Sequence, residues 1–368
     1  SGKRLVIKSQ DGAASTIFDA EGESRHLSIY YADTTFKLIG FTFKNGSHSG
    51  DGGSIYSRST NYAWGPVIES CVFDSNQTTS NYGRGGAIYT NGQIMLRDVE
   101  FNHNHSKYYG GALYVYGYQA AGDTSKTIIE RTKFYGNYVN SGTSSSAYGG
   151  AAYIYANYKM NHCTFDSNMI KMDEGYNYGG ALYSTGDNIS LSVNTFTDTS
   201  ITIQNTVFKQ NKIIKGSDGG YAYGGGLAIR GNRKTIIENC LFINNEVKGA
   251  PYTDSYSETR NGDGYGGAVY AGLNYQYIND AYQAKNSTVF INNTFANNSA
   301  AGEYTRGGGI HGEYSQNIIL FNNIFWGNKS LREMTTANWG WSEMWNDYTM
   351  SSYNKLYFSN NSFEYFDP

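Results

Sequence analysis

The stretch "FNHNHSKYYGGALYVY" at residues 101–116 holds both motifs that decide the fold. It begins with Phe-x-x-Asn and ends with a glycine pair, a small residue, an aliphatic residue and a tyrosine. The Phe-x-x-Asn motif recurs at Phe73, Phe101, Phe134, Phe165, Phe208, Phe242, Phe295 and Phe325. The glycine motif recurs clearly at Gly85, Gly110, Gly149, Gly179 and Gly266, and in weaker form at Gly52, Gly224 and Gly307. Two motifs that alternate along most of the chain indicate one repeating structural unit.

The spacing of the repeats indicates a solenoid. Phe73 and Phe101 lie 28 residues apart, which is too short for a folded domain and suits one coil. Phe43 suggests an earlier coil and Phe363 a later one. Around each motif, apolar and polar residues alternate with a period of two, as in short strands with one buried face. Glycine is too frequent for helices, and no apolar period of 3.6 residues occurs.

We therefore predict an all-β fold, a single-stranded parallel β-helix of nine to ten coils with three short strands per coil. The crossover rule for parallel strands favours the right-handed form. One domain spans residues 1–368, with loop insertions near 246–265 and 271–287. The tryptophan-rich stretch near 331–350 is expected to cap the open end of the solenoid, and the alternative is that it forms an aromatic binding patch.

Each motif residue has an expected structural role. Stacked coils place equivalent side chains about 4.8 Å apart, so the phenylalanines should form an inward aromatic ladder. The asparagines should lie at a corner, where their amides bond one another and the turn backbone. The glycine pair permits a tight turn with positive φ, and the tyrosine that follows should point outward.

Composition excludes two classes of partner. The 28 basic residues against 31 acidic residues do not favour binding to nucleic acid or to an anionic membrane surface. No apolar run approaches the length of a membrane span, and no signal peptide is recognisable. The abrupt start at Ser1 is typical of a processed or trimmed end, so we expect any export signal or anchor to lie outside this sequence.

The two motifs are similar to the repeats of chlamydial polymorphic outer-membrane proteins. The stretches "LVIKSQDGAASTIFDAEG" (5–22) and "IGFTFKNGSHSGDGGSIY" (39–56) resemble the first coils of secreted, pectin-lyase-like bacterial proteins. The resemblance implies a right-handed β-helix that is secreted or displayed at the cell surface. It does not select a function, because this superfamily includes adhesins, polysaccharide lyases and glycosidases.

The candidate ligand-binding residues are outward tyrosines. They are Tyr56, Tyr89, Tyr114, Tyr153, Tyr183 and Tyr270, with Tyr116 and Tyr155 two positions further along the same face. In other coils, the positions equivalent to Tyr116 and Tyr155 hold Arg58, Asn91, Thr185, Arg230 and Glu313. Exposed aromatic rings beside hydrogen-bonding groups suit a sugar chain. The alternative, which is compatible, is that neighbouring tyrosines stabilise the sheet by about 0.2–1 kcal/mol per pair.

Loops between the two motifs are a second candidate surface. Residues 139–148, 170–178, 212–223 and 246–265 should leave the solenoid at one corner and form a ridge. Loops on a rigid scaffold often carry binding sites, although tolerated variation in loop length is the commoner explanation of such loops.

No convincing catalytic or metal site is visible. Asp74 and Asp166 are three coils apart, about 14 Å, so they do not form a glycosidase pair. The nearest group with a base and a cation is Arg306, His311 and Glu313, which we do not assign as catalytic. His103 and His105 are expected to be solvated rather than to bind metal.

No cofactor is expected. A loop calcium ion is a weaker alternative, because the stretches at 49–53 and 261–267 resemble calcium-binding repeats without their nonapeptide spacing.

The function expected from these features is a non-enzymatic surface adhesin that contacts a polysaccharide, or a glycan or protein on a host or neighbouring cell. The first alternative is a polysaccharide lyase or glycoside hydrolase of the pectin-lyase-like superfamily. The second is a structural stalk or surface-layer component.

Three cysteines test the coil register. Cys71, Cys163 and Cys240 each lie two residues before a motif phenylalanine, and therefore in one inward column. Successive members are three and two coils apart, about 14 and 10 Å, whereas a disulfide needs Cα atoms within about 7 Å. We predict three buried free thiols, even in an oxidising compartment.

Overall fold

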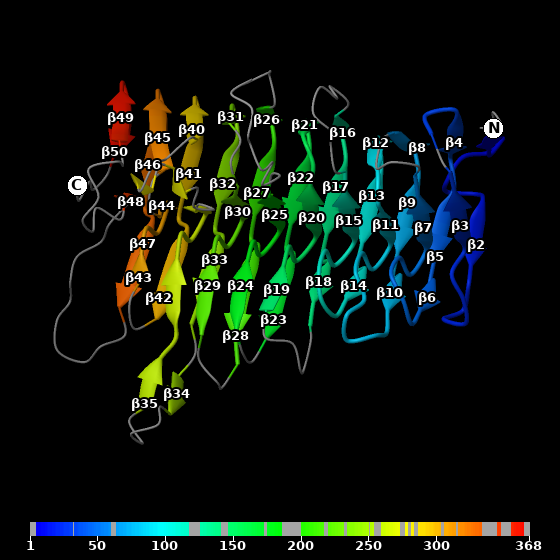
Figure 1. The fold of residues 1–368 in the computed structure, drawn as a ribbon, viewed down its shortest axis with the longest axis horizontal. Helices are drawn as coiled ribbons and strands as arrows, with labels where there is room; N and C mark the ends of the chain where they lie inside the picture. The colour runs from blue at the N-terminus through cyan, green and yellow to red at the C-terminus, as the bar shows by residue number, and fades with distance from the viewer. Residues whose placement is uncertain are drawn as a thin grey trace.

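The computed structural model describes the chain as an all-β solenoid whose coils follow one another along a single axis (Figure 1). No helix occurs in the residues that it describes. These are residues 5–31, 33–59, 64–117, 126–140, 146–172, 175–185, 200–216, 220–231, 234–249, 251–253, 259–272, 277–278, 281–282, 286–302, 305–313, 316–332, 344–346 and 355–363.

One coil illustrates the repeating path. Its strands in chain order are β20 (Ala152–Tyr155), β21 (Tyr158–Asn161), β22 (Thr164–Asp166), β23 (Met169–Met172) and β24 (Tyr176–Tyr178), after which β25 (Leu182–Thr185) begins the next coil beside β20. Each strand pairs in parallel with its equivalents in neighbouring coils. The predicted parallel β-helix is therefore confirmed, and its path is consistent with a right-handed coil.

The strands assemble into five parallel sheets, which we call A to E. Sheet A contains 11 strands from β1 (Leu5–Lys8) to β49 (Lys355–Ser359), and sheet B contains 11 from β2 (Ile17–Asp19) to β50 (Ser362–Phe363). Sheet C contains ten strands from β3 (Leu27–Tyr30) to β48 (Met344–Asn346), and sheet D nine from β6 (Ser47–His48) to β47 (Lys329–Arg332). Sheet E contains β19 (Ser146–Tyr148), β24, β29 (Tyr221–Tyr223), β36 (Asp263–Tyr265) and β43 (Thr305–Arg306).

A complete coil contributes four strands to sheets A to D, which corrects the expected three. The additional division arises because the residues that flank the sheet B strand of each coil adopt left-handed backbone angles. In the coil above, His162 (φ 53°) separates β21 from β22, and Ser167 (φ 57°) separates β22 from β23. A left-handed residue bends the chain sharply, so one expected strand becomes two short ones.

The phenylalanine ladder runs through the centre of the solenoid. From Phe43 to Phe325, successive rings lie 4.5–5.2 Å apart with interplanar angles of 2–17°. All of these rings are buried, and Phe18 extends the stack to sheet B's first strand. Aromatic stacking in every coil fixes the register of the repeats.

The asparagine ladder fixes the adjacent corner. The Asn168 side chain donates from Nδ2 to Phe134 O and to Asn211 Oδ1, both at 2.9 Å. Its own Oδ1 accepts bonds at 3.0 Å from the backbone N and from Nδ2 of Asn137. The same pattern links the buried asparagines Asn76, Asn104, Asn137, Asn168, Asn211, Asn245, Asn298 and Asn328. The predicted role of these amides is confirmed.

The glycine pair makes the corner between sheets E and C. Gly179 has a φ of 72°, and a Cβ built there would lie 2.3 Å from Leu182 O. A Cβ built on Gly180 would lie 2.2 Å from Gly225 O in the next coil. The first glycine is therefore required by backbone conformation and the second by the close approach of neighbouring coils.

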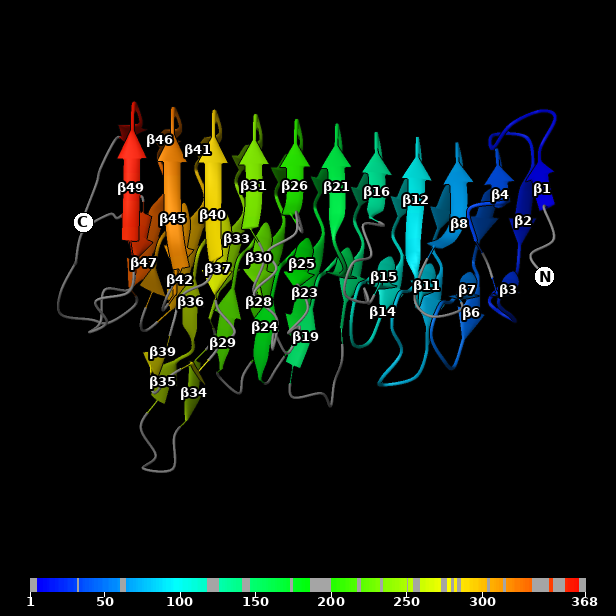
Figure 2. The same ribbon diagram turned by 45° about the horizontal axis from the view of Figure 1, so that its top comes forward.

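The described parts of the stretches expected to be loops form strands of a projecting fin. In coils where sheet E is present, a strand of sheet D runs outward and a strand of sheet E returns (Figure 2). The two sheets enclose a second small core, made of Val139, Ala147, Ile170, Met172, Ile213, Ala222 and Val247. The predicted ridge is therefore present, but paired strands make up much of its described part. Apolar residues within these stretches supply enough surface for two packed layers.

The two predicted insertions each contain a short antiparallel pair. Strands β34 (Pro251–Thr253) and β35 (Thr259–Asn261) pair within the first, and β38 (Tyr277–Ile278) and β39 (Ala281–Tyr282) within the second. The tryptophan-rich stretch contributes β48 to sheet C, while residues 333–343 lie outside the described part of the chain. Its capping role stays a prediction.

The three cysteines are free and buried, as predicted. Cys163 donates from Sγ to Asn161 O at 3.4 Å, and Cys240 donates to Glu238 O at 3.3 Å. Burial raises the pKa of each of these two thiols to about 12. They act as small, unreactive fillers of the core.

Candidate functional site

The predicted tyrosines form a stacked column on the outer face of sheet C. Tyr56, Tyr89, Tyr114 and Tyr153 stack with centroid distances of 4.7–5.2 Å and interplanar angles of 4–18°. Tyr116 and Tyr155 stack in the parallel second column at 4.8 Å and 6°. The columns therefore exist where the sequence placed them.

The expectation that all these rings are exposed was wrong. Tyr89, Tyr114, Tyr183 and Tyr270 are only 1–8 % exposed. The other predicted tyrosines are half-buried: Tyr56, Tyr116, Tyr153 and Tyr155. Tyr89 and Tyr114 lie beneath the Arg84 guanidinium, which is 4.9 and 5.0 Å from their ring centroids. Tyr183 and Tyr270 are covered by a third aromatic column, which the sequence-based prediction did not include.

This third column covers part of sheet C. It contains Tyr148, Tyr178, Tyr223 and Tyr265 of sheet E, whose successive rings stack at 4.5–5.3 Å. Tyr178 and Tyr223 pack with Tyr183 and Tyr270 in a buried cluster outside the main core. Together, the columns of sheets C and E form what we call the tyrosine wall.

The sequence contained a signal for the third column. Its members are the residues directly before each glycine pair: Asp51, Arg84, Tyr109, Tyr148, Tyr178, Tyr223, Tyr265 and Arg306. The positions of Arg84, Tyr109 and Tyr148 are linked by parallel bridges, which continue the line of sheet E toward the N-terminal coils. In seven of these eight copies the glycine pair therefore follows a tyrosine or an arginine, and the exception is Asp51.

Stacking limits what the covered section of the wall can bind. Rings inside a face-to-face stack have neighbours on both faces, so a sugar can reach only their edges and hydroxyl groups. Burial raises the pKa of Tyr114 and of Tyr183 to about 12, so both phenols stay protonated at neutral pH. Here the alternative reading, in which tyrosines stabilise the sheet, accounts for the geometry.

The N-terminal section of the wall is open. A hollow of about 260 Å³, which we call the Tyr56 hollow, is lined by Tyr56, Arg58, Arg84, Tyr89, Asn91 and Tyr116. Three of these are predicted ligand-binding tyrosines, and Arg58 and Asn91 were expected to share their face. Sheet E begins only at β19, which directly precedes β20 in the chain. In sheet C, β20 lies three strands beyond the strand that holds Tyr56, so the fin does not cover this hollow.

A second hollow adjoins the first through Arg84. It has a volume of about 430 Å³ and is lined by Gly50, Asp51, Ser80, Tyr82, Gly83, Arg84, Tyr108 and Tyr109; we call it the Tyr82 hollow. Tyr82 is 73 % exposed and meets Tyr108 edge to face at 5.8 Å. The two hollows give an extended polar and aromatic surface over several coils.

Arg84 is held rigidly between these hollows. Its Nε donates to Asp51 Oδ1 at 2.9 Å and its Nη2 to Oδ2 at 2.6 Å. The guanidinium lies 4.9 Å from the Tyr89 ring centroid and 5.0 Å from that of Tyr114. Partial burial lowers the pKa of Arg84, but the bonds with Asp51 outweigh it and raise the pKa above its usual value. Arg84 therefore stays charged.

The residues considered for catalysis lie together at the far end of the wall. Arg306 pairs in register with Tyr265, and the His311 ring lies 5.0 Å from that of Tyr265. Tyr270 donates a hydrogen bond from its hydroxyl to Glu313. His311 is only 2 % exposed, so a polymeric substrate cannot reach its imidazole in this conformation.

Arg230 belongs to the same region. Its guanidinium lies 4.9 Å from the Tyr178 ring centroid. Burial lowers the pKa of Arg230, but its electrostatic interactions with Tyr178, Tyr183 and Glu313 raise that pKa by more. The pKa of Arg230 therefore lies above its usual value. The cluster therefore resembles a buried electrostatic network more closely than an accessible acid–base pair.

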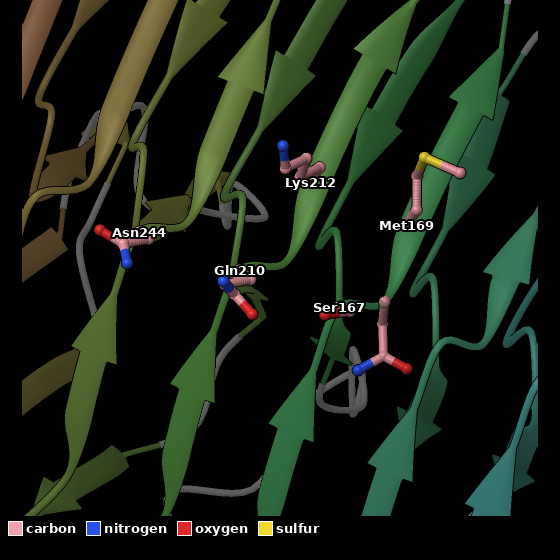
Figure 3. Close-up of a pocket in the computed structure, with 6 residues that line it drawn as sticks. Ser167, Met169, Gln210, Lys212 and Asn244 are labelled. Carbon is pink, nitrogen blue, oxygen red and sulfur yellow. The ribbon is translucent and has the colours of Figure 1, made fainter.

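A further hollow of about 470 Å³ lies at the corner between sheets B and D (Figure 3). Ser167, Gln210 and Asn244 come from equivalent turns of successive coils, and Met169 and Lys212 from the strands that follow. Lys212 is paired with Glu246 at 3.3 Å. This surface repeats from coil to coil and shows no distinctive grouping.

Among the described residues, no three His, Cys, Asp or Glu side chains come together. His103 is exposed, but His105 is half-buried against the Tyr138 ring at 4.3 Å, which corrects the expectation that both are solvated. In the two glycine-rich stretches, the Asp51 carboxylate binds Arg84, and Asp263 accepts a bond from the Tyr265 hydroxyl at 2.9 Å.

Residues 70–91 match the Chlamydia polymorphic membrane protein repeat. This segment contains one Phe-x-x-Asn motif and the glycine motif that follows it. No curated protein matches the chain significantly. The described residues contain no helix long and apolar enough to cross a membrane.

Proposed function

We propose that this chain is a surface-displayed β-helix scaffold that binds a glycan at the open section of its tyrosine wall. The observation that carries the proposal is the Tyr56 hollow, where three predicted tyrosines meet two arginines and an asparagine. Aromatic rings with a few convergent polar groups are typical of ligand sites. The match to a polymorphic membrane protein repeat supports display at the cell surface.

The geometry of the hollow suits a carbohydrate chain rather than a compact cofactor. The hollow is small, but Arg84 connects it to the Tyr82 hollow, so a chain of several sugar rings can lie across both. Tyr56 and Tyr116 lie in neighbouring columns and are half-buried, so each presents part of its ring and its hydroxyl to a ligand. Hydrogen bonds from these groups would orient the sugar hydroxyls.

A glycan array probed with the purified chain tests this proposal. The variant Tyr116→Ala should lose binding, because it removes one side of the hollow. Tyr135→Ala is the matched control, since Tyr135 is an exposed tyrosine (46 %) on sheet B, away from the wall. If no glycan binds the wild-type chain, or if both variants bind as it does, the proposed site is wrong.

A second candidate function is polysaccharide cleavage. Arg306, His311 and Glu313 lie together near Arg230 and supply a cation, a base and an acid, but His311 is buried, so cleavage would require the cluster to open. A degradation screen on the same material separates the two functions. New unsaturated or reducing ends, lost in Glu313→Gln, would assign an enzyme at the far end of the wall. Binding without new ends supports the adhesin, and absence of both favours the structural stalk.

A further inference from the structure

We propose that the Tyr56 hollow selects sugar rings that carry an anionic group, either a carboxylate or a sulfate ester. The inference rests on the proposed function, because it names the class of glycan that the same hollow binds. The site is distinct from the Arg306, His311 and Glu313 cluster, which lies at the other end of the wall.

The first observation is a local excess of positive charge in a chain whose net charge is −3. Arg58 and Arg84 line the hollow, and the Arg25 guanidinium lies 5.2 Å from the Tyr56 ring centroid. The one carboxylate bound to this group is that of Asp51, which Arg84 engages with both oxygens. Three cations against one anion leave an excess that attracts a negatively charged ligand.

The second observation concerns the availability of Arg58. It is exposed at the end of β7 (Ile55–Arg58), on the outward side of sheet C. Within the described residues, its guanidinium makes no ion pair or hydrogen bond. Arg25, by contrast, donates to Gly52 O at 2.7 Å and bonds His48 Nδ1 at 2.8 Å. Arg58 is therefore the cation that can pair with a ligand, while Arg25 and Arg84 supply fixed charge.

The third observation is that the remaining polar groups favour an acceptor. Asn91 already uses its Oδ1 to accept a bond from Ser59 N at 2.7 Å, which leaves its Nδ2 group to donate. A guanidinium and an amide N–H group beside each other match the oxygens of a carboxylate or sulfate. A neutral sugar hydroxyl would use these donors less fully.

The experiment compares matched pairs of oligosaccharides by isothermal titration calorimetry. The carboxylate pair is hyaluronan hexasaccharide and the same molecule with its carboxylates reduced to alcohols. The sulfate pair is sulfated isomaltohexaose and unsulfated isomaltohexaose. We expect at least one anionic member to bind about tenfold or more tightly than its neutral partner, the size of one charge-assisted hydrogen bond. The pair that shows this difference identifies which anion is recognised.

Charge-matched variants locate the effect. Arg58→Gln should remove the preference for the anionic member, and Arg58→Lys should retain part of it. Lys159→Gln, which removes one charge from the exposed face of sheet A, should change nothing. Higher salt should reduce the preference, because surface ion pairs are screened.

The outcomes separate this inference from the proposed function. Equal binding of anionic and neutral members would overturn the inference and leave glycan binding intact. A preference that survives in Arg58→Gln would also overturn it. Failure of both the array and all four hexasaccharides would overturn the proposed function and the inference with it.

Discussion

The phenylalanine ladder inside the solenoid and the tyrosine wall outside it are both aromatic stacks, yet they behave differently along the axis. From Phe43 to Phe325, the inner stack keeps its rings buried and nearly parallel in every coil. The outer stack tilts to 40° between Tyr153 and Tyr183, is interrupted at Ala228, and changes from open to covered where the fin begins. The phenylalanine ladder, which is the same in every coil, maintains the fold. The tyrosine wall varies from coil to coil and is the part that can carry a binding site.

Alkaline pH should produce the largest difference between the two stacks, because only tyrosine titrates. Burial raises the pKa of Tyr114 and Tyr183 to about 12, against about 10 in an unfolded chain. A raised folded-state pKa contributes stability that is complete below pH 10 and lost as pH rises toward 12. The free energy of unfolding should therefore fall by up to about 1.4 kcal/mol per pH unit for each such tyrosine.

Urea denaturation at a series of pH values measures this loss. The buried thiols, with the pKa of Cys163 and Cys240 at about 12, act in the same direction and begin to contribute near pH 9. A free energy of unfolding that stays constant from pH 9 to 12 would show that Tyr114 and Tyr183 are solvated rather than buried.

Removing one ring from the inner ladder should have the next largest effect. Phe165→Ala creates a cavity between Phe134 and Phe208, whose rings lie 4.5 and 4.8 Å away. The free energy of unfolding should fall by about 3–5 kcal/mol. The control Tyr135→Ala, on the exposed side of the same sheet, should change it by less than about 1 kcal/mol. Similar losses in both would contradict the division between inner and outer aromatic residues.

Interrupting the asparagine ladder should cost somewhat less. Asn168→Ala removes the acceptor of two Asn137 donors and the donor to Phe134 O, and leaves these groups buried. We expect a loss of about 2–4 kcal/mol in the free energy of unfolding. Asn102→Ala, at a half-buried position on sheet B, should cost about 0.5 kcal/mol or less. Equal effects would show that water replaces the ladder bonds.

A reductant should have no effect on stability. With Cys71, Cys163 and Cys240 free, the melting temperature should be the same with and without dithiothreitol. Thiol titration after denaturation should find three sulfhydryl groups per chain without prior reduction. A single free thiol with a cross-linked peptide would show that the coil register is wrong.

Sequence alone predicted the inside of the molecule well, and the outside less well. The positions of the Phe and Asn ladders follow from spacing, because identical residues recur at equivalent positions and stacking leaves one arrangement. The left-handed residues that divide each coil, such as His162 and Ser167, were not predicted, since their types vary from coil to coil.

The fin and the coverage of Tyr183 and Tyr270 were not predicted for a different reason. Whether an outward side chain is exposed depends on which segments fold back over it, and stretches such as residues 170–178 looked polar enough to be loops. The tyrosine or arginine before most of the glycine pairs was the signal that could have revealed the third column. Arg84 and Asp51 were missed because their pairing spans two coils.

The most direct test of the account compares a tyrosine in the open section of the wall with a tyrosine on the fin, outside the wall. Tyr116 lines the Tyr56 hollow, whereas Tyr221 is 38 % exposed on the fin and stacks on Tyr176 at 5.1 Å. The measurement is the affinity of Tyr116→Ala and Tyr221→Ala for the tightest-binding glycan of the array. We predict at least tenfold weaker binding for Tyr116→Ala, with far-ultraviolet circular dichroism unchanged, and a change of less than twofold for Tyr221→Ala. The reverse pattern, or equal losses in both variants, would contradict a binding site at the open section of the wall.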